Sequence, residues 1–151
     1  GGTWSNELTT PADLSEEALE QACIDIASFT TDRGLTISIM PQKLIIPPDL
    51  EFEAFRILES IGQSGTANND TNAIRASKKF PQGVAVNHYL SDTNNWFIKA
   101  NCPDGLKYME RRADAFGSEN DFDTENAKFK ATFRGSFGWT DPRGIFGSSP
   151  A

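Results

Sequence analysis

His88 is the only histidine of the 151-residue chain, so a catalytic triad or a histidine-ligated metal site would have to be built around it. Ser91 and Asp92 follow closely, but residues within one turn of chain are poorly placed to act as nucleophile and orienting acid around one base. The surrounding segment 83–90, "GVAVNHYL", is typical of a strand and favours His88 as a polar residue on its solvent side. This segment gives no support for an enzyme.

Two other segments contain residue types that bind ions or phosphates in other proteins. Residues 121–126, "DFDTEN", lack the glycine and the distant bidentate Glu of a calcium loop, so we interpret them as a solvated hairpin loop. Residues 62–66, "GQSGT", lack both the Lys-Ser/Thr pair and the strand-to-helix context of a phosphate loop. We therefore predict a protein that is not an enzyme and has no catalytic residue, no metal and no cofactor.

The charge balance argues against nucleic acid as a direct ligand. The chain has 21 acidic and 14 basic residues, a net charge of −7, and its only dense basic pairs are Lys78-Lys79 and Arg111-Arg112. Binding to a phosphate backbone relies on a basic surface. Arginine side chains suit carboxylates across an interface between subunits. The predicted subunit-interface residues are Arg75, Lys78, Lys79, Arg111 and Arg112.

The cysteines and the apolar content bear on the compartment and the solubility of the protein. Cys23 and Cys102 lack a C-x-x-C spacing and are interpreted as free thiols of a reducing compartment, with a single disulfide as the alternative. No stretch approaches the roughly 20 apolar residues that span a bilayer, and no signal peptide is recognisable, so we expect a soluble protein with no membrane partner.

The first half of the chain predicts two helices and two short strands. Leu14, Ala18, Ala22 and Ile26 recur at four-residue steps and indicate an amphipathic helix, with Thr10 or Ser15 as its cap. Short strands are expected at 35–39 and 43–47, the second buried on both faces. After Pro47 and Pro48, Asp49 is expected to cap a helix that ends near Gly62.

The second half predicts β-structure after a polar stretch. Residues 62–79 are rich in Gly, Asn and Ser and are interpreted as a loop. Strands are expected within 83–90, 94–101 and 105–112. From 128 to 139 polar residues alternate with Phe, Ala, Gly and Trp, which indicates a long strand with one buried and one wet face. The order of elements predicts an α+β fold with mainly antiparallel pairing.

The ordered combination resembles the major capsid (major head) proteins of tailed bacteriophages, particularly the Mu-like group. Three segments carry the resemblance: "SFTTDRGLTISIMPQKLIIPPDLEFEAFRIL" (28–58), "NAIRASKKFPQGVAVNHYLSDTNNWFIKAN" (72–101) and "GLKYMERRADAFGSENDFDTENAKFKATFRGSFGWTDPRGIFG" (105–147). It covers nearly all of residues 10–147. The chain is similar to the C-terminal half of such a subunit, because the arm, extended loop and spine helix of the family lie upstream of residue 10.

The resemblance implies the capsid fold named after phage Hong Kong ninety-seven, with an axial domain of helices packed on a small β-sheet and long antiparallel peripheral strands. Residues 1–103 would be the axial-domain portion, 104–141 the peripheral long strands, and 142–151 the C-terminal exit segment. The polar segment 62–79 would contribute contacts near the capsomer axis.

The implied function is a major capsid subunit that assembles into an icosahedral shell around double-stranded DNA. Its partners would be copies of itself in pentamers and hexamers, and scaffold, portal or decoration proteins, with genomic DNA enclosed but not bound by sequence. It would reside in the virion after assembly in the host cytoplasm. The alternatives are an encapsulin-like nanocompartment shell subunit, and a β-rich carbohydrate- or peptide-binding module with Trp96 or Trp139 in a groove.

Overall fold

The protein was analysed as a computed structural model that describes residues 5–62, 70–120, 123 and 125–150. Its contacts divide the chain into two compact units, each described by itself below. Unit 1 consists of Gly1–Gly105 with Asp141–Ala151, and unit 2 consists of Leu106–Thr140.

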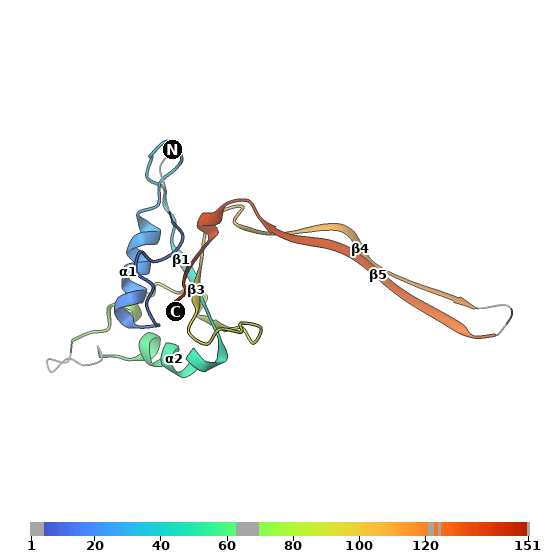
Figure 1. The fold of residues 1–151 in the computed structure, drawn as a ribbon, viewed down its shortest axis with the longest axis horizontal. Coiled ribbons are helices and arrows are strands. Elements are labelled where there is room, and N and C mark those ends of the chain that lie inside the picture. Colours follow the sequence, from blue (N-terminus) through green and yellow to red (C-terminus); the bar gives the residue numbers. More distant parts are fainter. Residues whose placement is uncertain (1–4, 63–69, 121–122, 124, 151) are drawn as a thin grey trace. The chain divides into compact units, whose positions relative to one another are not determined.

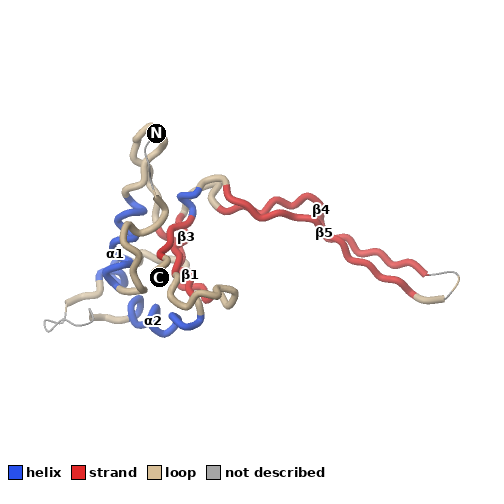
Figure 2. Tube along the Cα trace, viewed as in Figure 1, coloured by secondary structure: helices blue, strands red, loops and turns tan. Residues whose placement is uncertain are grey.

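Unit 1 is built around a four-stranded sheet (Figure 2). Its strands are β1 (Pro41–Ile46), β2 (Val84–Val86), β3 (Trp96–Ala100) and β6 (Ile145–Ser148), in the order β2-β1-β3-β6. The β1–β2 pair is parallel and the other two pairs are antiparallel. Together with the helices, this confirms the predicted α+β class.

Three helices and two short 3-10 turns complete the described part of unit 1. They are α1 (Glu16–Ala27), η1 (Pro48–Leu50), α2 (Glu51–Glu59), α3 (Ala73–Ser77) and η2 (Pro142–Gly144). Figure 1 shows α1 running beside the sheet. The apolar stripe of α1 is buried as predicted, with Leu19, Ala22 and Ile26 fully inaccessible to solvent.

Trp96 is the largest fully buried side chain of this core. Its indole Nε1–H donates a hydrogen bond to the carbonyl oxygen of Ala12 at 3.1 Å, which satisfies the polar end of the ring. The Ser148 hydroxyl accepts from the Ala12 N–H and donates to the Ala12 carbonyl, at 3.0 and 2.9 Å. These bonds fix the segment before α1 against β3 and β6.

Unit 2 is a two-stranded antiparallel ribbon made of β4 (Leu106–Asn120) and β5 (Ala127–Trp139) (Figure 1). The pairing runs from Leu106 opposite Trp139 to Asn120 opposite Ala127. Two register shifts interrupt it, one on either side of Arg112. The long antiparallel strands predicted for this part of the chain are therefore present.

Two predictions for the first half of the chain are wrong. No strand forms at 35–39, where Thr36 only bridges Thr30, and β1 instead begins at Pro41. Asp49 does not cap α2, whose N-cap is Leu50 without a side-chain bond. The reason is that Pro48, with its fixed φ, starts a 3-10 turn that contains Asp49 and leads directly into the helix.

The polar segment 62–79 is not a loop throughout, because it contains α3; residues 63–69 lie outside the described part of the chain. The Asn72 side chain accepts a hydrogen bond from the Arg75 N–H at 3.1 Å and so caps this helix, while Ile74 reaches the core. The predicted strand 83–90 is limited to β2, and His88 lies exposed in the turn that follows.

Ser15 is the cap of α1, since its hydroxyl accepts a hydrogen bond from the Ala18 N–H at 3.1 Å. Replacing Ser15 by Ala should lower the free energy of unfolding by about 1 kcal/mol, because a helix-terminal donor loses its partner. Urea unfolding measures this change. Thr10→Ala is the matched control, and an equal loss in both variants would contradict the assignment.

Candidate functional site

The ribbon has one apolar face along its length. In an antiparallel pair, residues directly opposite one another share a face, and alternate residues of a strand return to it. Leu106 lies opposite Trp139, Tyr108 opposite Phe137, and Phe116 opposite Ala131. The apolar face, as named below, comprises Leu106, Tyr108, Phe116, Phe129, Phe133, Phe137 and Trp139.

This face is exposed rather than buried. Its seven large side chains are between 52% and 84% accessible to solvent. The alternation in β5 was predicted correctly, but the burial of its apolar side was wrong, because a ribbon of two strands has no second layer of its own. A contiguous exposed apolar patch of this kind marks an interaction surface.

Two side chains of the apolar face, Tyr108 and Phe137, pack against each other. The rings of Tyr108 and Phe137 have centroids 4.9 Å apart and are tilted by 38°. The Tyr108 ring also lies over Gly135, where an added Cβ would collide with it. This part of the apolar face is thus preformed, which lowers the entropy lost when a partner covers it.

The opposite face of the ribbon is rich in basic side chains, although these residues do not form one cluster in the sequence. Arg112 lies directly opposite Arg134, and Lys107, Lys128 and Lys130 alternate onto the same side. Unit 2 has six basic and six acidic residues in sequence, so the whole net charge of −7 lies in unit 1. Sequence inspection missed this stripe because cross-strand pairing assembles it.

The predicted interface residues form two separate groups. Arg75, Lys78 and Lys79 line one hollow of about 410 Å³ in unit 1, together with Phe80. Lys78 ends α3 in the left-handed region, with φ of 49°. Arg111 and Arg112 instead line a hollow of about 520 Å³ on the ribbon, together with Thr132, Phe133 and Arg134.

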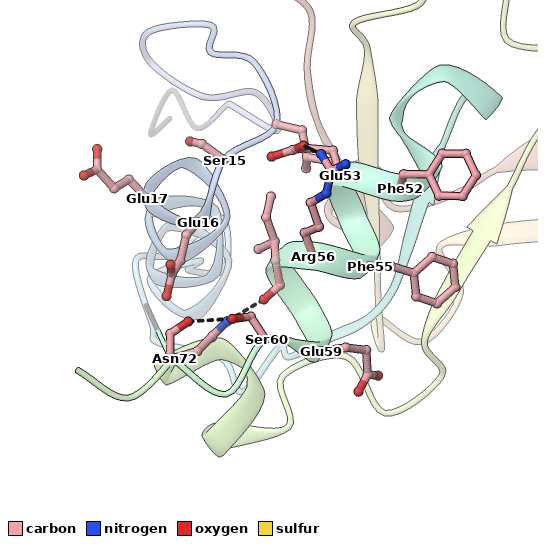
Figure 3. Close-up of a pocket in the computed structure, with 13 residues that line it drawn as sticks. Ser15, Glu16, Glu17, Phe52, Glu53, Phe55, Arg56, Glu59, Ser60 and Asn72 are labelled. Carbon is pink, nitrogen blue, oxygen red and sulfur yellow. Dashed lines mark hydrogen bonds and ion pairs between the residues drawn. The ribbon is translucent and has the colours of Figure 1, made fainter. Parts of the chain in front are cut away.

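A larger hollow of about 890 Å³ is lined by residues of α1 and α2 and was not predicted from the sequence (Figure 3). Its acidic members are Glu16, Glu17, Glu53 and Glu59. Burial, followed by the charges of Glu20 and Glu17, raises the pKa of Glu16, whose Oε1 atom is inaccessible and has no hydrogen-bond partner. This surface therefore favours positive charge.

An ion pair stabilises the place where the ribbon joins unit 1. The guanidinium of Arg143 contacts the Asp141 carboxylate, with 2.6 Å between Nη2 and Oδ2, and donates through Nη1 to the Thr30 carbonyl at 3.0 Å. The hydrogen bond from Arg143 lowers the pKa of Asp141 to about 2. Both side chains are at most one-fifth exposed, so solvent screens the pair only partly.

Replacing Asp141 by Asn should cost about 2 kcal/mol of unfolding free energy at pH 7, because the folded carboxyl pKa is lowered from 3.8 to about 2. The lowered pKa gives stability above the unfolded value and loses it as the pH falls through about 2. Wild type and variant should therefore converge between pH 4 and 2 in urea unfolding.

The exposed Asp49 supplies a matched control for this measurement, as Asp49→Asn removes one carboxylate that makes no side-chain hydrogen bond. A wild-type advantage over Asp141→Asn that persisted undiminished at pH 2 would contradict the proposed role of the charge.

Catalytic chemistry finds no support in the described residues. Burial raises the pKa of the Cys23 thiol to about 11, and burial together with a hydrogen bond to Asp141 raises that of Cys102. Both cysteines are free and carry protonated, weakly nucleophilic thiols at neutral pH. Within residues 5–62, 70–120, 123 and 125–150, no three His, Cys, Asp or Glu side chains are grouped as metal ligands, and no helix has the length and hydropathy to cross a bilayer.

Comparison with known proteins gives a consistent result. No curated protein matches the chain significantly. Among solved structures, the fold is similar to the crystal structure of a virus-like particle from Pyrococcus furiosus, with a TM-score of 0.54, 14% identity, and coverage of 95% of this chain but 55% of that chain. The chain thus spans about half the length of that structure and shares its capsid-type fold. Residues 1–147 match the family described as phage capsid protein. The chain therefore belongs to the phage capsid protein family.

Proposed function

We propose that the chain is part of a shell-forming subunit, and that many copies assemble into an icosahedral capsid around double-stranded DNA. The apolar face of the ribbon is the observation that carries this proposal. Seven large apolar side chains stay exposed on one face of the ribbon, and a subunit that buries them against further copies gains the free energy of removing them from water.

The finer assignments follow the same proposal. Unit 1 would be the axial part of a Mu-like subunit with the Hong Kong ninety-seven type of fold, unit 2 the peripheral strands, and the segment after Asp141 the exit that supplies β6. Pentamers and hexamers would be the building blocks, with Arg75, Lys78 and Lys79 near the capsomer axis. Scaffold, portal or decoration proteins would be further partners, and the assembled protein would reside in the virion after assembly in the host cytoplasm.

Negative-stain electron microscopy of the complete gene product tests the proposal. Closed shells of uniform size are expected, and they should protect double-stranded DNA from nuclease when isolated from infected or induced cells. Dispersed subunits under all assembly conditions would contradict a shell function.

An encapsulin-like shell that encloses protein is the second candidate, supported by the similarity to a virus-like particle. Uniform shells that contain protein cargo and no nuclease-protected DNA would select it. A carbohydrate- or peptide-binding groove built on tryptophan is not retained, because Trp96 is fully buried and Trp139 belongs to the apolar face.

A further inference from the structure

Three arginines and an aromatic ring form a compact group on the ribbon. We name Arg111, Arg112, Phe133 and Arg134 the arginine knuckle; with Thr132 they line the ribbon hollow of about 520 Å³. The register of β4 shifts on both sides of Arg112. Such irregularities bend a strand and change the direction in which its side chains point. The knuckle therefore lies at the most distorted part of an otherwise regular ribbon.

The arginine knuckle carries an electrostatic cost within its own unit. Arg112 lies directly opposite Arg134, and like charges opposite one another destabilise a strand pair. Among the residues that the structure describes, no carboxylate forms an ion pair with Arg111, Arg112 or Arg134. Guanidinium groups bind carboxylates through two parallel hydrogen bonds. An acidic partner from outside would remove the repulsion and use this geometry.

The hollow between α1 and α2 has the opposite charge, because its ionisable side chains are mostly acidic. Four glutamates line it against a single basic residue, Arg56, which already pairs with Glu53 at 3.1 Å. Two aromatic rings belong to the same surface, as Phe52 is 74% and Phe55 49% exposed. Figure 3 shows both rings projecting from α2 on the side turned away from α1. A ligand that carries several cations matches the glutamates of this hollow.

We propose that the arginine knuckle of one copy docks on the α1–α2 hollow of a second copy. The inference rests on the proposed shell function and names the two surfaces that meet. The guanidinium groups of Arg112 and Arg134, which share the basic face of the ribbon, pair with the glutamates of the hollow. The acidic excess of unit 1 favours the approach of this basic part of the ribbon.

The proposed contact is heterologous, because the two surfaces differ. Each copy offers one knuckle and one hollow, so every copy can be donor and acceptor at once. Contacts of this kind close into rings or continue without limit, depending on the rotation between neighbours. A closed shell built from rings of subunits needs such a heterologous contact.

Charge reversal on each side tests the docking in the complete gene product. The knuckle variant is R112E/R134E, which keeps a like-charge pair across the strands and so leaves the local repulsion within the ribbon unchanged. The hollow variant is E53K/E59K, at two exposed positions of α2. The fourfold variant R112E/R134E/E53K/E59K restores opposite charges with their signs exchanged.

Each double variant should raise the protein concentration needed for assembly at least about tenfold, because charge pairs lost from an interface are replaced by repulsion. The fourfold variant should return to within about threefold of wild type. Light scattering during assembly measures both changes. R33E/K99E is the matched control, as it reverses two exposed basic residues outside the knuckle and the hollow and should assemble as wild type does.

Photo-crosslinking provides an independent measurement that does not depend on reversed charges. With p-benzoylphenylalanine in place of Thr132, which lines the ribbon hollow on the same face as Arg134, crosslinks to residues 51–62 are expected. In a mixture of nitrogen-14 and nitrogen-15 protein, these crosslinks should join differently labelled copies.

Wild-type assembly by both double variants, a fourfold variant no better than the doubles, or crosslinks that fall only elsewhere would overturn the docking while leaving the shell function intact. Normal shells of R112E/R134E that lose only their DNA would also overturn it and would assign the knuckle to nucleic acid. Failure of the wild-type protein to form any shell would instead contradict the proposed function itself.

Discussion

The double substitution F129S/F137S should abolish shell assembly while lowering the free energy of unfolding of the subunit by only about 1 kcal/mol, through loss of the Tyr108–Phe137 ring contact. Both rings belong to the apolar face and are 80% and 84% exposed, so the isolated subunit loses little packing. In a shell, each ring would bury on the order of 150 Å², worth about 4 kcal/mol. The concentration required for assembly should therefore rise more than about 100-fold.

Light scattering and electron microscopy measure assembly, and urea unfolding measures the free energy of unfolding of the subunit. Tyr89→Ser is the matched control, because Tyr89 is 96% exposed but lies in the turn after β2. It should change neither quantity. Normal shells formed by F129S/F137S at the wild-type concentration would show that the apolar face is not an assembly surface.

Trp96→Ala should have the largest effect on folding of any tryptophan substitution. The ring is fully buried, so its removal leaves a cavity and takes one of two hydrogen bonds from the Ala12 carbonyl, at a cost of about 3–5 kcal/mol. A loss of this size is a large share of the stability of a typical domain. We expect a strongly lowered Tm and little soluble protein.

Trp139→Ala is the control of equal size, as Trp139 is 68% exposed on the apolar face. Its free energy of unfolding should change by less than about 0.5 kcal/mol, while assembly weakens. Calorimetry and light scattering separate these effects. Equal destabilisation by both substitutions would show that the ribbon, too, depends on a buried tryptophan.

Patterns with local causes were predictable from the sequence. The four-residue spacing of apolar residues identified α1, and Ser15, its actual cap, was one of the two caps predicted, with Thr10 as the alternative. The alternation from 128 to 139 identified β5. In each case the geometric repeat of the helix or strand appears in the sequence as a regular spacing of apolar residues.

Features that depend on long-range pairing were not predictable. Alternation shows which side of β5 is apolar but not whether anything covers it, and the exposure of Phe137 follows from a sheet with only two strands. Arg134 and Arg112 are 22 positions apart in sequence, and only the strand register makes them neighbours. The acidic hollow likewise needs α1 and α2 placed side by side.

The order of strands in unit 1 has a consequence for how such a protein can change in length. β3 and β6 pair directly, yet the whole of unit 2 is inserted between them in sequence. The two ends of this insertion approach closely, since a Cβ added to Gly105 would lie 3.0 Å from the Cα of Gly144. Closing a loop costs little more when the loop doubles in length, about 0.6 kcal/mol. The connection between β3 and β6 should therefore tolerate ribbons of different lengths, while the rest of the sheet keeps its register.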